Sequence, residues 1–389
     1  MSKKVSDVYF VDMGTSPGNN LFDKIKRLIL AAGFDNLNLN KKFTALKIHF
    51  GEPGNFAYIR PVFVSIISQL VKEKGGIPFL TDSNTMYTGR RANAVNHLES
   101  AEKNGFLSAV TGCPVIIADG LRGTEYKNVE INLKYCKYAK IGTAIADSDV
   151  IISINHFKGH DMTGFGGALK NIGMGSGSRA GKRDMHSDSR PVVNKKKCRS
   201  CGMCIEACAA KAIEFGSDSK AHINEDICTG CGQCVAVCGN DAVAISANRD
   251  TEIVIKKIAE YSYAVLKDKK HFHITFIMDV SPNCDCWSHN DLPIVPNIGV
   301  LASFDPVAID QAAADLVNNA PGIIGSKLDK KGYKSGDDKF LALYPKSDWK
   351  GGIEYAVSLG LGNSKYNLIT EPFPKQKKLW ETGIFGVFP

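Results

Sequence analysis

The stretch TALKIHFGEPGNFAYIRPVFVSIISQLVKEKGGIPFLTD, residues 44–82, indicates how this chain folds. Apolar runs of strand length, TALKIHF and IPFLTD, stand at its two ends, and the amphipathic VFVSIISQLVKEKG lies between them. Two strands joined by a helix are typical of parallel pairing, because the chain must cross back over the sheet before the next strand. We therefore expect a β–α–β unit here.

The same alternation runs over most of the chain. Further strands are expected at 8–11, 115–119, 150–155, 272–279, 298–303 and 366–370, and further helices at 21–33, 91–105, 251–267 and 350–360. Another helix should begin at Asp305 and Pro306, because Asp is a good N-cap and proline fits the first helical position. The pattern predicts an α/β fold with a mostly parallel sheet and helices on both faces.

Length and composition narrow the class of protein. The 389 residues suffice for one large or two ordinary domains. The start, MSKKVSDVYFVDMG, lacks the apolar run of a signal peptide, and no segment approaches the roughly 20 apolar residues of a membrane span. We therefore expect a cytoplasmic protein with no membrane partner. In that reducing compartment the twelve cysteines point to metal binding more than to disulfides.

The formal charge of +8 does not predict a nucleic-acid partner. Apart from Lys195, Lys196 and Lys197 the positive charge is scattered, and no basic face with interleaved aromatic residues is evident. Thiolates bound in iron–sulfur clusters would also offset about half of the excess.

Two cysteine-rich segments repeat one pattern, CRSCGMCIEAC (198–208) and CTGCGQCVAVC (228–238). In each, three cysteines separated by two residues can bind one face of an iron–sulfur cube, whereas the fourth lies too far along the chain and ligates the cluster of the other half. The spacing therefore predicts two [4Fe-4S] clusters. The first would be held by Cys198, Cys201, Cys204 and Cys238. The second would be held by Cys228, Cys231, Cys234 and Cys208.

Zinc is the alternative, since it also binds four cysteines. Zinc sites do not normally need a third cysteine at this spacing, repeated with a remote fourth, so the pattern favours iron–sulfur clusters. Over about 50 residues the segment resembles bacterial-type ferredoxins with two [4Fe-4S] clusters. It departs from them at Ala209 and Gly239, where proline usually follows the fourth cysteine. Each replacement adds a backbone N–H near a cluster, so the resemblance does not predict the reduction potential of the clusters.

The cysteine segment interrupts the α/β pattern, which resumes directly after it. We expect an α/β domain in two parts, residues 1–190 and 247–389, with a ferredoxin-like module at 191–246 inserted between them. The glycine-rich GMGSGSRAGKRD (173–184) is interpreted as a flexible lead-in to this module. Lysines within 182–197 would suit an acidic electron donor.

Polar side chains gather where the predicted strands end. These residues are Asp12, His49, Asp82, Ser83, Asn84, Arg90, Asn155, His156, Lys158, His160 and Asp279. Each has an ordinary explanation, such as a packed core histidine for His49 or a helix cap for Asp82. Because ligands of open parallel sheets bind beyond the carboxyl ends of the strands, their joint occurrence predicts a binding or catalytic cleft. Its catalytic candidates are His49, His156, Lys158 and His160.

The segment GFGGALKNIGMG (164–175) has two explanations. Backbone N–H groups of Gly164, Gly166 and Gly167 could approach an anion, with Lys170 adding charge. It matches neither a P-loop nor a dinucleotide fingerprint, so a tight turn before a helix explains it equally well.

The cysteines outside the repeats differ in their surroundings. Cys113 and Cys136 are isolated and are expected to be free and buried. Cys284 and Cys286 lie in MDVSPNCDCWSHND, where both sulfurs could contact one metal ion with His289 as the third ligand. A redox thiol pair or a tight polar loop are the alternatives.

Three segments resemble an uncharacterised prokaryotic family, number 362 among the domains of unknown function. They are LKIHFGEPGN, HFKGHDMTGFGGALKNIGMG and NCDCWSHNDLPIVPNIGVLASFDPVAIDQAAADLV, so the resemblance spans nearly the whole chain. It implies an inserted or appended dicluster ferredoxin module but no particular reaction. It singles out His49, His156, Lys158, His160, Lys170, Cys284, Cys286 and Asp305 as site residues.

Two functions follow from these observations. The first is low-potential electron transfer, in which two clusters serve a redox partner protein or a site in the α/β domain. The second is a cluster-fed redox enzyme acting on a small anionic substrate at the strand ends, with a further metal at Cys284 and Cys286. A domain this large exceeds what docking requires, which favours the enzyme, whereas the lack of a flavin, nicotinamide or nucleotide motif favours the carrier.

Overall fold

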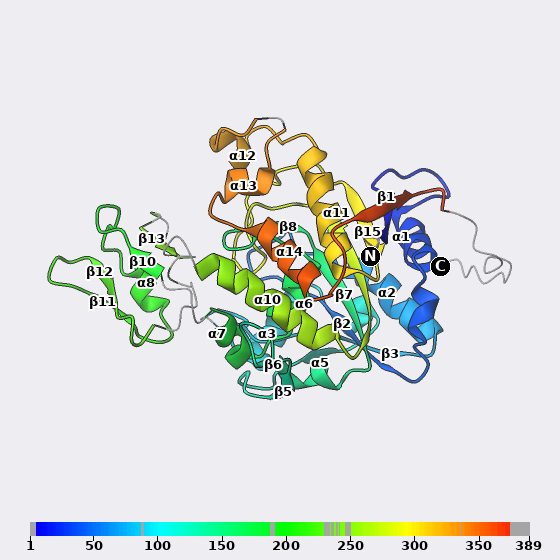
Figure 1. The fold of residues 1–389 in the computed structure, drawn as a ribbon, viewed down its shortest axis with the longest axis horizontal. Helices are drawn as coiled ribbons and strands as arrows, with labels where there is room; N and C mark the ends of the chain where they lie inside the picture. Colours follow the sequence, from blue (N-terminus) through cyan, green and yellow to red (C-terminus); the bar gives the residue numbers. More distant parts are fainter. Residues whose placement is uncertain are drawn as a thin grey trace.

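The computed structural model describes residues 5–373, except 87–88, 187–190, 229–233, 235–236, 239, 241, 246–249 and 335. Figure 1 shows a large α/β body and, at its left, a small lobe formed by the cysteine-rich segment. The expected cluster ligand Cys231 and the glycine at position 239 lie outside the described residues. Within them, no helix is long and apolar enough to cross a membrane.

One eight-stranded sheet organises the body, in the order β16-β1-β15-β14-β7-β2-β3-β4. Every neighbouring pair is parallel except the two that β15 makes, with β1 and β14. The strands are β1 (Ser6–Asp12), β2 (Phe43–Lys47), β3 (Ile77–Asp82), β4 (Val115–Ile117), β7 (Val150–His156), β14 (Lys270–Ile277), β15 (Gly299–Ser303) and β16 (Tyr366–Thr370). The prediction of a mostly parallel α/β sheet is confirmed.

Helices cover both faces of the sheet. One face packs on α1 (Leu21–Ala31) and α2 (Pro61–Glu73), and the other on α6 (Ala168–Ser176), α10 (Asp250–Leu266) and α11 (Pro306–Asn319). Side chains alternate between the two cores along a strand: Ile151 belongs to one and Ile152 to the other. Strands buried on both faces are therefore largely apolar, although β7 also buries Ser153, Asn155 and His156.

Shorter elements complete the body. The remaining helices are η1 (Phe34–Leu37), α3 (Ala94–Lys103), α4 (Ser108–Thr111), α5 (Thr143–Asp147), α7 (Arg179–His186), α12 (Lys327–Lys330), α13 (Lys339–Leu343) and α14 (Trp349–Ser358). Two hairpins pair β5 (Tyr126–Glu130) with β6 (Tyr138–Gly142), and β8 (Lys158–His160) with β9 (Gly164–Gly166). The carboxylate of Asp305 accepts from the N–H groups of Val307 and Ala308, so the predicted helix start is confirmed.

The prediction of a flexible lead-in at 173–184 is wrong. This glycine-rich segment forms the end of α6 and most of α7. A Cβ on Gly173 would lie 2.2 Å from the carbonyl oxygen of Ile258, and one on Gly181 would lie 2.6 Å from that of Lys140. The glycines therefore permit close packing of these helices against their neighbours, and they do not loosen the chain.

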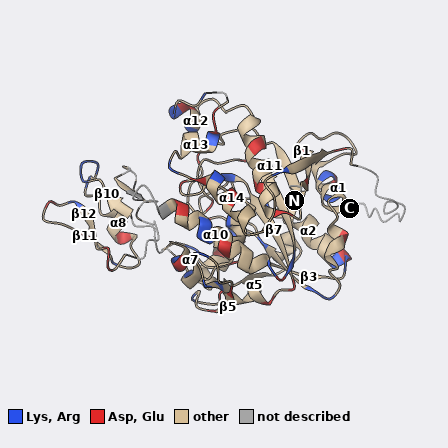
Figure 2. Ribbon diagram, viewed as in Figure 1, with Lys and Arg blue, Asp and Glu red and all other residues tan. Residues whose placement is uncertain are grey.

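The cysteine-rich lobe has its own small core. It contains β10 (Pro191–Val193), α8 (Met203–Glu206), β11 (Ile213–Phe215), β12 (Ala221–Ile223) and β13 (Val243–Ile245). Cys204, Cys234 and three apolar residues form the buried cluster at its centre. Strands β10 and β13 pair antiparallel, so the two ends of the segment lie side by side. Figure 2 shows Lys and Arg interspersed with Asp and Glu along the helices of the body.

Candidate functional site

The carboxyl ends of β7, β2 and β3 meet at one cavity. Because these strands are parallel neighbours, the residues that follow them converge at the same edge of the sheet. Of the residues expected there, His49, Asp82, Ser83, His156, Lys158 and His160 line the cavity, together with Lys170 and Cys286.

Other residues expected at strand ends have structural roles. Asp12 pairs with Lys24 beyond the end of β1, and Asp279 pairs with Arg60 at 3.0 Å. Asn84 donates to Asp119 at 2.8 Å. Asn155 lies behind the cavity, where its Oδ1 accepts from Asn171 at 2.8 Å. The Arg90 side chain is exposed, and Asp305 caps α11.

Asp285, which lies between the two cysteines of the CDC motif, anchors one side of the site. Its buried carboxylate accepts from His156 Nδ1 at 2.8 Å and from Lys158 Nζ at 2.9 Å. Burial alone would raise the pKa of Asp285, but the charges of His156 and Lys158 outweigh it and hold that pKa below its usual range. His156 Nε2 also lies 2.9 Å from the carbonyl oxygen of Met278. Both nitrogens of His156 are therefore engaged within the protein.

A second buried carboxylate, Asp82, anchors the opposite side. Lys47 Nζ lies 2.9 Å from its Oδ1, and a guanidinium nitrogen of Arg91 lies 3.8 Å from its Oδ2. The carboxylate is buried, which raises its pKa, yet the charges of Lys47 and Lys182 help to hold the pKa of Asp82 below its usual range. Burial and the charge of Arg91 place the pKa of His49 well below its ordinary value, so His49 is neutral.

Sequence reasoning missed several of these groups. Lys47, Arg91, Glu52 and Lys182 are buried beside the cavity, and Arg91 Nε donates to Glu52 at 2.8 Å. Lysine in the middle of TALKIHF was the available signal, because a charge in a strand buried on both faces requires a partner.

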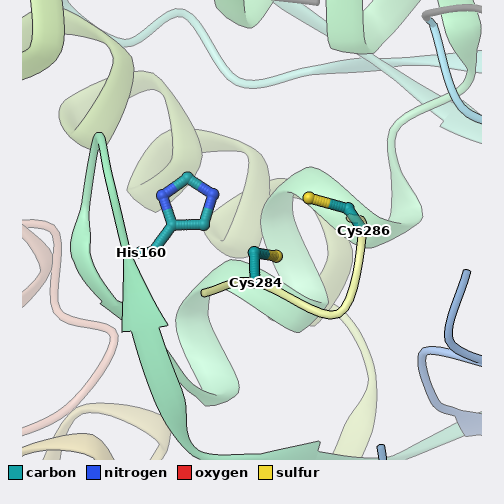
Figure 3. Close-up of side chains that lie close together, drawn as sticks. All are labelled: His160, Cys284 and Cys286. Atoms are coloured by element: carbon teal, nitrogen blue, oxygen red, sulfur yellow. The ribbon is translucent and has the colours of Figure 1, made fainter. Parts of the chain in front are cut away.

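Cys284 and Cys286 form the third part of the site (Figure 3). Their sulfurs and one ring nitrogen of His160 all lie within 4.8 Å of one another, and Lys170 Nζ lies 3.5 Å from Cys284 Sγ. A hydrogen bond from Cys286, aided by Lys170 and His160, outweighs burial and places the pKa of Cys284 well below its ordinary value. The pKa of Cys286 is raised by the same hydrogen bond and by burial.

This group of sulfur and nitrogen atoms could hold a metal ion, because Cys and His are the preferred ligands of zinc and similar metals. Among the described residues the group contains His160 and not His289. The ring of His289 packs edge-on against Trp287, with ring centroids 5.2 Å apart. The metal role of His289 stays a prediction from the sequence.

The cavity carries several cations. Lys158, Lys170, Lys182 and Arg91 all line it. Lys182 Nζ donates to the carbonyl oxygen of Gly177 at 2.6 Å, and burial lowers the pKa of Lys182 to about 8.

The glycine segment before α6 forms strand β9 and the N-cap Gly167, and a carboxyl group of the protein itself lies at the start of the helix. Asp310 of α11 accepts from the backbone N–H groups of Ala168 and Leu169, at 2.6 and 2.9 Å. The first N–H groups of α6 are thereby satisfied.

Four of the predicted cluster cysteines come together in the lobe. Cys198, Cys201, Cys204 and Cys238 line one cavity. The pKa of Cys204 is raised by burial and by the neighbouring sulfurs of this set. Backbone N–H groups donate to two sulfurs, from Ala212 to Cys208 at 3.2 Å and from Ala242 to Cys238 at 3.3 Å.

The two isolated cysteines are free and buried, as predicted. Burial raises the pKa of Cys113 to about 11, and burial together with Glu260 raises that of Cys136 to about 12. Both are therefore unreactive thiols in the body.

The chain is similar to proteins whose names state little about activity. Over 120 residues it is 28% identical to a thylakoid-associated protein of Synechocystis, which covers 31% of this chain and 34% of that protein. The chain therefore matches about a third of the length of that curated relative.

Two solved structures superpose on this chain with low scores. A protein from Thermotoga maritima superposes with a TM-score of 0.39 at 13% identity, over 77% of this chain and 59% of that one. The lactate racemase apoprotein from Thermoanaerobacterium thermosaccharolyticum superposes with a TM-score of 0.34 at 11% identity, over 92% and 78%. At these scores neither bears on function.

A family assignment rests on a longer match. Residues 44–315 match the family described as Domain of unknown function (DUF362), and this range includes the sheet edge, the CDC motif and the cysteine-rich lobe. The match spans more than half of the sequence, so the chain belongs to the DUF362 family.

Proposed function

We propose that this protein is an iron–sulfur redox protein that holds two [4Fe-4S] clusters and passes low-potential electrons to a partner protein or into the strand-end cavity. One observation carries the proposal: Cys238 of the second repeat lines the same cavity as Cys198, Cys201 and Cys204 of the first. This interleaving is the arrangement that the spacing predicts for two cubes.

The chemistry of the donor set supports clusters in the lobe. The pKa of Cys204 is raised because it is buried among other sulfurs, so a bound cationic core would relieve the repulsion between the thiolates. Backbone N–H groups of Ala212 and Ala242 hydrogen-bond to sulfur, which is how proteins tune the potential of a cluster. Bound there, the clusters would supply one-electron transfer.

The attachment of the lobe favours the cavity as the destination of the electrons. His186 ends α7 just before the lobe, and Val254 lies in the first turns of α10 just after it. Both residues line the strand-end cavity. The two chain segments that carry the lobe therefore leave the body at the cavity wall.

The chain's own residues suit a redox enzyme that acts on a small anion. Lys158, Lys170 and Lys182 would bind and orient the anion, and Asp285 fixes His156 and Lys158 in place. His160 and Cys286 also lie at the wall of the cavity, where either could carry a proton. Electron transfer to an external partner stays the alternative, and it would not require this cavity.

The first test is a count of iron and sulfide in protein purified without oxygen. We expect about eight of each per chain. Cys238→Ser should lose about half of both, whereas Cys136→Ser, which removes a buried cysteine of the body, should lose none. Protein that contains zinc in the lobe and no sulfide would contradict the proposal.

A further inference from the structure

We propose that His160, Cys284 and Cys286 form a three-ligand site for a soft divalent transition metal, with its open position facing the cavity, where a small anion completes the coordination. The inference rests on the proposed function, because it concerns the cavity that would receive the electrons. It specifies the metal and the class of substrate that this cavity would bind. Its geometry, however, does not involve the lobe.

The spacing of the donor atoms fits one ion. Zinc lies about 2.3 Å from sulfur and about 2.0 Å from nitrogen, so ligand atoms around one tetrahedral ion are roughly 3.5–4 Å apart. The three donor atoms here already lie within 4.8 Å of one another without an ion. Small rotations of the side chains would close the site.

The fold holds the two ligand segments together. His160 is the last residue of β8, and the backbone N–H of Gly159 donates to the carbonyl oxygen of Ser281 at 2.8 Å. A Cβ at Gly159 would lie 2.4 Å from the carbonyl oxygen of Pro282, so only glycine permits this approach. Asp285, held by His156 and Lys158, fixes the loop between the two cysteines.

Asp161 supplies the outer partner that a metal-bound histidine normally has. Its Oδ1 lies 3.2 Å from His160 Nδ1. Nδ1 also accepts from the N–H groups of Met162 and Thr163, at 3.1 and 3.2 Å. With Nδ1 engaged in these contacts, Nε2 would be the metal ligand, and the contacts would hold the ring in position.

The charges around the site specify an anion as the fourth ligand. Two thiolates and a neutral imidazole cancel the charge of a divalent ion, which leaves the ammonium group of Lys170 uncompensated beside Cys284. Among the three ligands, His160 and Cys286 line the cavity, which Lys170 and Lys182 also line. A carboxylate-bearing small molecule fits an open metal position next to a lysine.

Zinc binding to the full chain tests the site directly. Protein prepared without oxygen and carrying its clusters is incubated with Zn²⁺ and desalted, and zinc, iron and sulfide are counted in the same sample. Peptide mass spectrometry then measures alkylation of Cys284 and Cys286 with and without Zn²⁺. We expect one zinc per chain and protection of both cysteines.

Matched variants identify the ligands. His160→Ala and Cys286→Ser should lose the bound zinc, whereas His289→Ala and Cys136→Ser should keep it. Asp161→Ala, at a side chain that is 31% exposed and whose loss leaves the core intact, should weaken zinc binding about 10- to 100-fold. This last variant keeps the test decisive if a substitution of a buried ligand prevents folding.

Three outcomes would overturn the inference. They are wild-type protein that neither binds zinc nor shows protection of its cysteines, His160→Ala protein that binds zinc as tightly as wild type, and His289→Ala protein that loses it. The iron and sulfide counts separate the two proposals. Intact clusters without the zinc site refute this inference alone, and a zinc site without clusters refutes only the proposed function.

Discussion

The cysteine-rich lobe and the strand-end cavity both gather sulfur, but they balance its charge differently. In the lobe, burial and, to a smaller extent, the neighbouring cysteines raise the pKa of Cys204. In the cavity, Lys170 and His160 lie against Cys284 and help to lower its pKa. The thiolate of Cys204 is therefore disfavoured by its surroundings, whereas the cavity compensates the charge of Cys284 in part from its own side chains.

The largest effect is expected in the lobe, where the interleaving of the repeats can be broken one cluster at a time. Cys238→Ala should remove the same cluster as Cys201→Ala, and Cys208→Ala should remove the same cluster as Cys228→Ala. Each variant should lose about half of the iron. Electron paramagnetic resonance of the reduced variants identifies the remaining cluster. Matching spectra for Cys208→Ala and Cys201→Ala would refute the interleaved assignment.

In the cavity, the pairing of buried charges contributes to the free energy of unfolding. Asp285→Asn leaves His156 and Lys158 buried without their carboxylate, so the free energy of unfolding should fall by about 3–5 kcal/mol. Urea denaturation measures this change. Asp291→Asn, in an exposed part of the same loop, is the control and should change stability by less than about 0.5 kcal/mol. Equal effects of the two variants would mean that Asp285 does not compensate these cations.

A smaller loss of stability is expected from a substitution in α6, the helix on which Lys170 lies. Gly173→Ala would place a Cβ 2.2 Å from the carbonyl oxygen of Ile258 and force α6 away from α10, at a cost of about 1–3 kcal/mol in stability. Thermal unfolding measures it, with Gly322→Ala as the control, because a Cβ there finds its nearest neighbour at 3.5 Å. The iron content of the lobe should be unchanged. A stability equal to that of the control would show that this close approach is not required.

The smallest effect is a change of folding stability with pH, which we expect from a buried histidine of the body. Burial lowers the pKa of His97 to about 3, against 6.5 in the unfolded chain. Between these values the unfolded chain binds the extra proton, so stability falls as the pH drops below 6.5. Between pH 7 and pH 5.5 the loss from this one group is about 1 kcal/mol. Denaturation of His97→Gln over this range should show a shallower loss than wild type, and parallel curves would contradict the assignment.

Much of the fold was predictable because its signals are local. The apolar runs at β2, β3 and β7, the proline after Asp305 and the spacing of the cysteines each act over a few residues. Glycines were the exception. The glycines of 173–184 were interpreted as flexible, yet Gly173 and Gly181 contact other elements closely, and no local pattern distinguishes those two roles.

For the site, the sequence by itself determined which strand ends carry polar residues and which cysteines repeat. Only the tertiary structure decided the partners: His160 beside Cys284 and Cys286, Asp285 between His156 and Lys158, and Lys47 with Asp82. The physical reason is that a buried charge or thiolate is stabilised by whichever group the fold brings within a few ångströms, and parallel strands bring together residues that are far apart in the chain.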